Sequence, residues 1–165
     1  MEKVFSGKVW KLGDDIDTDT IIAGRHGVIL DKKEMGSHCL ETLRPEFASQ
    51  VKPGDILVAG KNFGCGSSRE MAAEAINVHG VYCIIAKSFA RIFFRNAINN
   101  GMILIENDEI PEACQEGDII TVEVNRCVRV NGKEFEINKI PDNLFQIISE
   151  GGLVKSTIKK MEELK

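Results

Sequence analysis

The 165-residue sequence has few cysteines, and their spacing is wrong for most of the sites that cysteines build. They are odd in number, lie far apart and include no Cys-x-x-Cys pair. A disulfide framework and a self-contained zinc or iron-sulfur site both need regular or close spacing, so neither is predicted. We expect no metal in this chain and five reduced thiols, most of them core residues: Cys39, Cys65, Cys83, Cys114 and Cys127.

Excess positive charge and long apolar runs are also missing. The 21 basic and 25 acidic residues give a net charge of −4, so there is no basic stripe to neutralise the phosphates of a nucleic acid. No apolar run approaches the length that a bilayer requires, and the first residues lack the basic and apolar parts of a signal peptide. These absences predict a cytoplasmic protein that binds neither nucleic acid nor membrane.

The length and composition predict one globular domain over residues 1–165. A chain of this size can bury a full core, and its apolar content of 43% is ordinary for such a domain. The sequence contains no internal repeat, linker or low-complexity tract. Nothing in it requires a second domain.

Apolar segments separated by glycine stops predict an α/β fold with a parallel βαβαβ core. After this core, short alternating segments over 117–138 predict antiparallel strands, with Asn131-Gly132 as a hairpin turn. We expect core strands at 55–60, 81–86 and 102–106, and core helices at 68–79 and 88–100, the second capped by Ser88.

The flanking segments complete the prediction. Residues 3–12 alternate as a first strand, and residues 31–43 have helical spacing, with Asp31 as N-cap and Glu34 completing a capping box. Two closing helices follow at 141–150 and 153–164, separated by Gly151-Gly152. The second is strongly charged, so we expect it to be exposed.

Residues 61–70, Lys-Asn-Phe-Gly-Cys-Gly-Ser-Ser-Arg-Glu, join a predicted strand to a predicted helix through a Gly-x-Gly turn. Helix amides, two hydroxyls and a guanidinium therefore converge, which favours an anion. A Walker loop is excluded because Gly-Lys-Ser/Thr is missing, and Arg69 disfavours a dinucleotide fingerprint. Three interpretations remain: a phosphate cradle, a carboxylate or oxyanion site, or only a capping box in which Ser67 accepts from the Glu70 amide.

Two neighbouring features are weaker signals. Cys65 lies near a helix start, where a thiolate would be favoured, but no histidine nearby in sequence could act as its base. Residues 14–19 carry four carboxylates without the glycine and glutamate that an EF-hand loop needs. We interpret this acidic stretch as Asx turns and caps that shape a connection.

Three separated motifs resemble one known family. Residues 7–19, 60–70 and 86–99, in this order along the chain, are similar to motifs of the 3-isopropylmalate dehydratase small-subunit family of the aconitase superfamily. The resemblance spans nearly the whole chain. It implies a swivelling β/β/α domain, in which the parallel βαβαβ core is accompanied by a second, smaller antiparallel sheet.

The resemblance also implies a function. The family isomerises 2-isopropylmalate and 3-isopropylmalate by dehydration and rehydration, in leucine biosynthesis, a branched-chain amino acid pathway. It implies a heterodimer in which this hydro-lyase subunit is active only with a large subunit. That partner would hold a 4Fe-4S cluster as Lewis acid, this chain would hold no cofactor, and the substrate would be a small dicarboxylate.

Site residues follow from the same match. Ser67 corresponds to the catalytic base, Ser68 and Arg69 to substrate-binding residues, and Arg25 is a further candidate for a substrate carboxylate. The family's specificity loop corresponds to His26, Gly27, Val28 and Ile29, where relatives commonly have Tyr-Leu. A Ser67 hydroxyl engaged as a helix cap would point away from substrate. The roles of helix cap and catalytic base therefore require different orientations of the same hydroxyl.

The departure in the specificity loop leaves other functions open. The small subunit of homoaconitase or of 2,3-dimethylmalate dehydratase would share the same motifs. From other classes, a stand-alone anion- or phosphate-binding module and a purely structural partner of a catalytic subunit also fit the residues.

Overall fold

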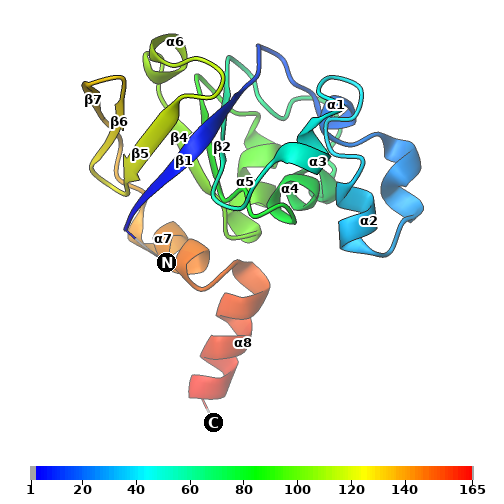
Figure 1. Ribbon diagram of the computed structural model, residues 1–165. Helices are drawn as coiled ribbons and strands as arrows, with labels where there is room; N and C mark the ends of the chain where they lie inside the picture. The colour runs from blue at the N-terminus through cyan, green and yellow to red at the C-terminus, as the bar shows by residue number, and fades with distance from the viewer. Residues whose placement is uncertain (1–2, 165) are drawn as a thin grey trace.

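A computed structural model describes residues 3–164 of the chain (Figure 1). Its strands and helices alternate from residue 56 to residue 123, after a first strand and four short helices. Their bounds are β1 Val4–Lys11, α1 Thr18–Ile21, the 3-10 helix η1 Gly24–Val28, α2 Lys32–Gly36, α3 Phe47–Gln50, β2 Ile56–Ala59, α4 Glu70–Asn77, β3 Cys83–Ala86, α5 Arg91–Asn99, β4 Ile103–Glu106, α6 Ile110–Ala113, β5 Ile119–Glu123, β6 Cys127–Val130, β7 Lys133–Glu136, α7 Asp142–Ser149 and α8 Leu153–Glu163.

The strands form a seven-stranded mixed sheet in the order β4-β3-β2-β1-β5-β6-β7. β1 to β4 are parallel, with Val9 opposite Ile56, whereas β5 pairs antiparallel with β1, with Phe5 opposite Val122. The predicted fold class is confirmed, with a parallel core and a smaller antiparallel part, but the antiparallel strands continue the same sheet and do not form a second one. The two parts are continuous because both pair with β1.

The parallel half is covered on both faces, as its uninterrupted apolar strands require. Right-handed crossovers that always step in the same direction place α1 to α5 on one face, where they pack on alternate strand residues such as Leu57 and Ile84. The other face carries Ile56 and Ile85 and is covered by α6, α7 and the strands of the antiparallel half (Figure 1).

Two predicted helix details are wrong. The helix predicted over 31–43 ends at Gly36, although Asp31 does cap it by accepting from the Glu34 amide at 2.8 Å. Turns follow because Leu40 is fully buried with a φ of 56°, so core packing overrides the helical spacing. Ser88 does not cap α5, whose N-cap is Ala90; its Oγ instead accepts from the Asn62 amide at 2.8 Å.

The closing helices lie where the sequence predicts them, within one residue at each end. α7 packs against α5, and α8 extends from the body with its C-terminal part away from the other elements (Figure 1). Among residues 3–164, none of the helices has both the length and the apolar composition needed to cross a membrane.

Candidate active-site turn

The turn at residues 60–69 follows the carboxyl end of β2 and is held by the acidic segment 13–19. The two segments exchange backbone hydrogen bonds: the Gly64 amide donates to the Ile16 carbonyl at 2.7 Å, and the Thr18 amide donates to the Cys65 carbonyl at 2.8 Å. The Asp14 carboxylate accepts from the Lys61 amide at 2.7 Å. The acidic residues therefore shape a connection, as predicted, and they fix the path of the turn.

Glycine is required inside this turn for two separate reasons. Gly64 has a φ of 81°, which L side chains rarely adopt, and a Cβ there would lie 2.2 Å from Cγ of the Phe93 ring. Gly66 has a φ of 94° and lies beside Thr18. A side chain would strain the backbone at both positions and would also clash with Phe93 at residue 64.

Ser67 does not cap α4, so the capping-box interpretation is wrong. The helix begins at Glu70, its N-cap residue is Arg69, and no side chain accepts a hydrogen bond from its first amides. The Ser67 carbonyl is fixed instead, because it accepts from Thr18 Oγ1 at 2.9 Å and from the Arg69 amide at 2.9 Å. The residue is exposed, and its hydroxyl makes no hydrogen bond among the described residues.

Arg69 connects three elements at the start of α4. Its Nη1 lies 2.6 Å from Asp19 Oδ1 of α1, and the guanidinium covers Gly24, the first residue of η1. A Cβ at residue 24 would lie 2.4 Å from Nη1. The arginine is therefore held in place by one acid and one glycine, at the junction of the turn and the predicted specificity loop.

The predicted specificity loop lies next to this turn. Residues 24–28 form η1, and Gly27 faces the side chain of Met71 on α4, since a Cβ at residue 27 would lie 3.4 Å from the Met71 sulfur. Val28 is exposed and Ile29 is half-buried against the core. The structure therefore brings the loop and residues 67–69 together, as the motif match requires.

Arg25 and His26 converge on the carboxylate of Glu41, which lies outside the loop. Arg25 Nη2 and His26 Nε2 lie 2.8 Å and 2.7 Å from Glu41 Oε1, while His38 Nδ1 lies 2.7 Å from Oε2. The two imidazole rings stack with centroids 3.8 Å apart and planes 10° apart. Arg25 is thus engaged by Glu41 in the isolated chain, and His26 is a half-buried anchor of the loop.

This cluster has the residue types of a metal site but a different geometry. The candidate ligand atoms of His26, His38 and Glu41 lie within 4.8 Å of one another. A metal ion lies in the plane of each imidazole that binds it, and two stacked, nearly parallel rings have no such shared point. Hydrogen bonds from His38 and His26 explain the arrangement instead, and they lower the pKa of the Glu41 carboxyl to about 2.

Cys65 is not activated by its position. Burial raises the pKa of its thiol, and the nearby charges of Asp17 and Asp15 raise that pKa further. The expectation that the helix start favours a thiolate is therefore wrong, because burial, and after it the two carboxylates, disfavour the charged form of this thiol. A nucleophilic role for Cys65 loses its physical basis.

Sequence reasoning missed the residues that support the site. Asp19 and Thr18 were interpreted only as part of an acidic connection, and Glu41 and His38 were interpreted only as part of a helix. The Asp-Thr-Asp string at 17–19 is within a motif that the family shares, and this was the available signal. No sequence pattern links Glu41 to His26, because only the turns after Gly36 bring them together.

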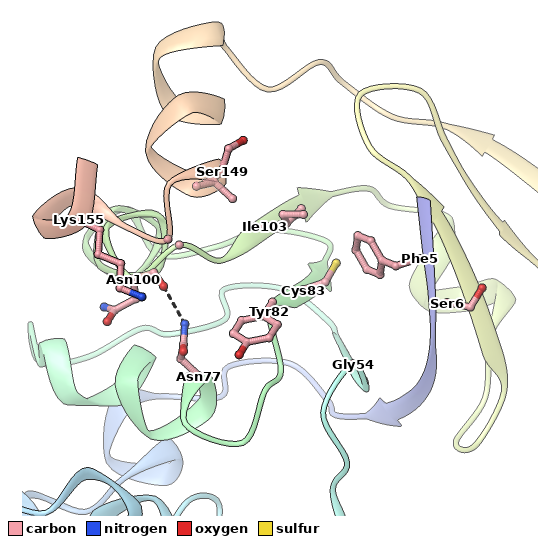
Figure 2. A pocket seen from close by; sticks show the side chains of 13 residues that line it. Phe5, Ser6, Gly54, Asn77, Tyr82, Cys83, Asn100, Ile103, Ser149 and Lys155 are labelled. Carbon is pink, nitrogen blue, oxygen red and sulfur yellow. Dashed lines mark hydrogen bonds between the residues drawn. The ribbon is translucent and has the colours of Figure 1, made fainter. Parts of the chain in front are cut away.

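A separate groove lies at the opposite end of the sheet (Figure 2). It has a volume of about 510 Å³ and is lined by Phe5, Cys83 and Ile103, where parallel strands begin, and by Lys155 of α8. Residues 67–69 do not line it. The turn instead lies on an open surface at the carboxyl ends of the strands, where ligands of parallel sheets bind.

Comparisons with known proteins agree over the length of the chain. The model of the aconitase C-terminal domain family matches residues 30–110. A 3-isopropylmalate dehydratase small subunit from Lachnospira eligens is 56% identical over 156 residues, covering 94% of this chain and 95% of that protein. The small subunit 1 from Archaeoglobus fulgidus is 51% identical, with coverage of 90% and 94%. A crystal structure of 3-isopropylmalate dehydratase from Methanocaldococcus jannaschii matches with a TM-score of 0.92 at 39% identity, covering 98% and 97% of the two chains.

Proposed function

Because the chain belongs to the family of 3-isopropylmalate dehydratase small subunits, we propose that it supplies Ser67, Ser68 and Arg69 to a hydro-lyase site shared with a large subunit. The reaction interconverts 2-isopropylmalate and 3-isopropylmalate in leucine biosynthesis. Relatives with 56% and 51% identity carry this enzyme's name, which favours isopropylmalate over the homoaconitate and dimethylmalate alternatives.

Ser67 is the proposed base, and its free hydroxyl is the observation on which the proposal depends. Dehydration removes a proton from a carbon next to a carboxylate, and the oxygen of Ser67 accepts that proton. A serine alkoxide is too costly in water, so it needs local positive potential. The unpaired first amides of α4 and the guanidinium of Arg69 supply that potential beside it.

Arg69 is the proposed carboxylate-binding residue, and Asp19 is its positioning residue. A planar guanidinium presents several donors. Arg69 can therefore bind a substrate carboxylate through one edge of its guanidinium while another edge stays paired with Asp19. The Asp19 contact at 2.6 Å and the close packing on Gly24 hold the guanidinium before substrate arrives. Less conformational freedom is then lost on binding.

The loop at His26, Gly27, Val28 and Ile29 is proposed to contact the isopropyl group. It lies beside α4 and presents an exposed apolar side chain at Val28. Arg25, one residue earlier, is proposed to reach a substrate carboxylate after leaving Glu41, because its side chain is exposed. Neither role requires a movement of the core.

We place the 4Fe-4S cluster in the large subunit. The cysteines of this chain do not fit such a group, because Cys39, Cys83, Cys114 and Cys127 are buried, and among the described residues no three cysteines lie close enough to share a metal. When bound by the partner, the cluster supplies the Lewis acid that assists loss of hydroxide. Five free thiols and the enzyme's metabolic role support a cytoplasmic location.

The decisive variant is Ser67→Ala, assayed with the large subunit. We expect kcat to fall by at least about 100-fold, since general bases contribute roughly 10² to 10⁴ in rate. Because the hydroxyl is not a cap, the free energy of unfolding should change by less than about 0.5 kcal/mol. Turnover and thermal melting are measured on the same preparation.

Ser68→Ala is the matched control for removal of a neighbouring exposed hydroxyl. We expect it to raise KM while retaining measurable turnover. An active but destabilised Ser67→Ala enzyme would remove Ser67 from the mechanism and restore its role as a cap. A large subunit that turns over substrate equally well without this chain would reject the shared site.

A further inference from the structure

Helix α8 carries an apolar stripe that the rest of the described chain leaves uncovered. Val154, Ile158 and Met161 are spaced four and three residues apart, so they lie on one side of the helix, and they are 72%, 51% and 61% exposed. Ser156 is buried and points to the opposite side, toward the body of the protein. The stripe therefore faces outward along a helix that projects from the fold (Figure 1).

The two flanks of the stripe differ in character. At 3.6 residues per turn, Lys155 and Glu162 lie on one flank, and Leu153 and Leu164 lie on the other. Both leucines are exposed, Leu164 by 87%. Lys159 pairs with Glu150 at 3.1 Å, whereas neither Lys155 nor Glu162 has an ion-pair partner within the described residues. Lys155 lies at the rim of the groove in Figure 2.

The flanking residues are placed nearly symmetrically along the helix axis on the two sides of Ile158. Lys155 lies three residues before it and Glu162 four after, which are about 4.5 Å and 6 Å along the axis. Leu153 and Leu164 are similarly placed at about 7.5 Å and 9 Å. In an antiparallel helix pair related by a two-fold axis, each flank faces the same flank of the other helix. Lysine then meets glutamate twice, and leucine meets leucine twice.

We propose that two copies of this chain associate through α8, packed antiparallel across a two-fold axis near Ile158. The stripe and its flanks are self-complementary in residue order and in charge, as an isologous contact requires. One helix pair of this length buries less area than most stable complexes, so the dimer is weak and its population depends on concentration. α8 leaves the body where the parallel strands begin, so the turn at Ser67 remains open to a large subunit.

Charge-swapped chains test the pairing directly. Lys155→Glu gives a chain with two glutamates on the flank, and Glu162→Lys gives a chain with two lysines. In a dimer of either variant alone, like charges face each other twice. We therefore expect the dissociation constant of that dimer to rise by about tenfold or more. An equimolar mixture restores both opposite-charge contacts and should form a heterodimer about as tight as the wild-type dimer. Sedimentation velocity over a range of concentrations at low salt measures the dissociation constants of the two single variants and of their mixture.

Two further variants separate the stripe from general surface effects. Ile158→Asp should leave only monomer, while Leu30→Asp, which changes another highly exposed leucine outside α8, should leave the dimer unchanged. Far-ultraviolet circular dichroism confirms that each variant is folded. A wild-type chain that stays monomeric at every concentration overturns the proposal, even if Ile158→Asp then weakens binding to the large subunit. Equal association of the single variants and the mixture also overturns it.

Discussion

Residue 24 is required to be glycine because the Arg69 guanidinium occupies the space that a Cβ would need. Its own backbone does not have a positive φ, so the requirement comes only from the neighbouring element. We expect Gly24→Ala to push the guanidinium from its ion pair with Asp19. KM in the assembled enzyme should rise by about tenfold, the effect of roughly one weakened charged hydrogen bond between Arg69 and the substrate carboxylate. Stability should change little, because a flexible side chain can move.

Gly13→Ala is the control for this substitution. Residue 13 also lacks a positive φ, and a Cβ there would meet nothing within 4 Å. Its KM should equal that of the wild type. If both alanine variants bind substrate normally, the packing of Arg69 on Gly24 has no role in binding.

Glu41 makes stability depend on pH in the acidic range. Hydrogen bonds from His38 and His26 lower the pKa of its carboxyl from 4.5 to about 2. A lowered folded-state pKa means that the stabilisation is present above the unfolded pKa and is lost as the pH falls toward the folded value. The stability difference between the wild type and Glu41→Gln should therefore shrink as the pH falls from about 5 toward 2.

Urea unfolding at several pH values measures this difference. Glu136→Gln is the control, because Glu136 is exposed and has no ion pair within the described residues. A pH dependence that both variants share does not come from the histidines. A Glu41→Gln difference that varies with pH no more than that of the control would show that the histidines do not hold the carboxylate in solution.

At the scale of elements, the turn between β2 and α4 depends on backbone conformation and on packing together. Gly64 and Gly117 have similar φ values, 81° and 85°, but only Gly64 would place a Cβ against a side chain, Phe93. Gly117→Ala should therefore cost about 1 kcal/mol from backbone strain. Gly64→Ala should cost about 1–3 kcal/mol more from overpacking.

Thermal and chemical unfolding of the two variants give the comparison, and turnover is measured in parallel. Gly117 lies far along the chain from the site, so its variant should remain active when folded. Equal destabilisation of the two variants would mean that the Phe93 ring moves away without cost.

The helices and strands were predictable where local pattern and burial agree. The core segments and the Asn131-Gly132 hairpin fall within this class, because glycine stops and apolar runs mark them in the sequence. The helix after Asp31 was not predictable, since the burial of Leu40 in a left-handed conformation is a tertiary effect. Likewise, Ser67, Ser68 and Arg69 were found from their motif, but Asp19 and Glu41 act through contacts between segments that no local pattern records.

At the scale of the whole molecule, an open turn implies a partner that covers it. We expect hydrogen exchange at residues 64–69 and in η1 to slow on addition of the large subunit, as groups at a shared cleft become buried. The turn at Asn125, between β5 and β6, lies at the other end of the sheet and should exchange at the same rate with or without the partner. Unchanged exchange at residues 64–69 would place the shared site elsewhere.

β1 lies between the parallel and antiparallel halves, and its neighbours come from distant parts of the chain. Ser6 and Thr121 are hydrogen-bonded across β1 and β5 although they are 115 residues apart in sequence. During synthesis, β1 therefore leaves the ribosome first but keeps one edge unpaired until β5 has followed. Pairing over such a separation is slow, and an open edge can pair with other nascent chains. The synthesis of the residues between β1 and β5 therefore sets a minimum time during which this edge can pair with another chain.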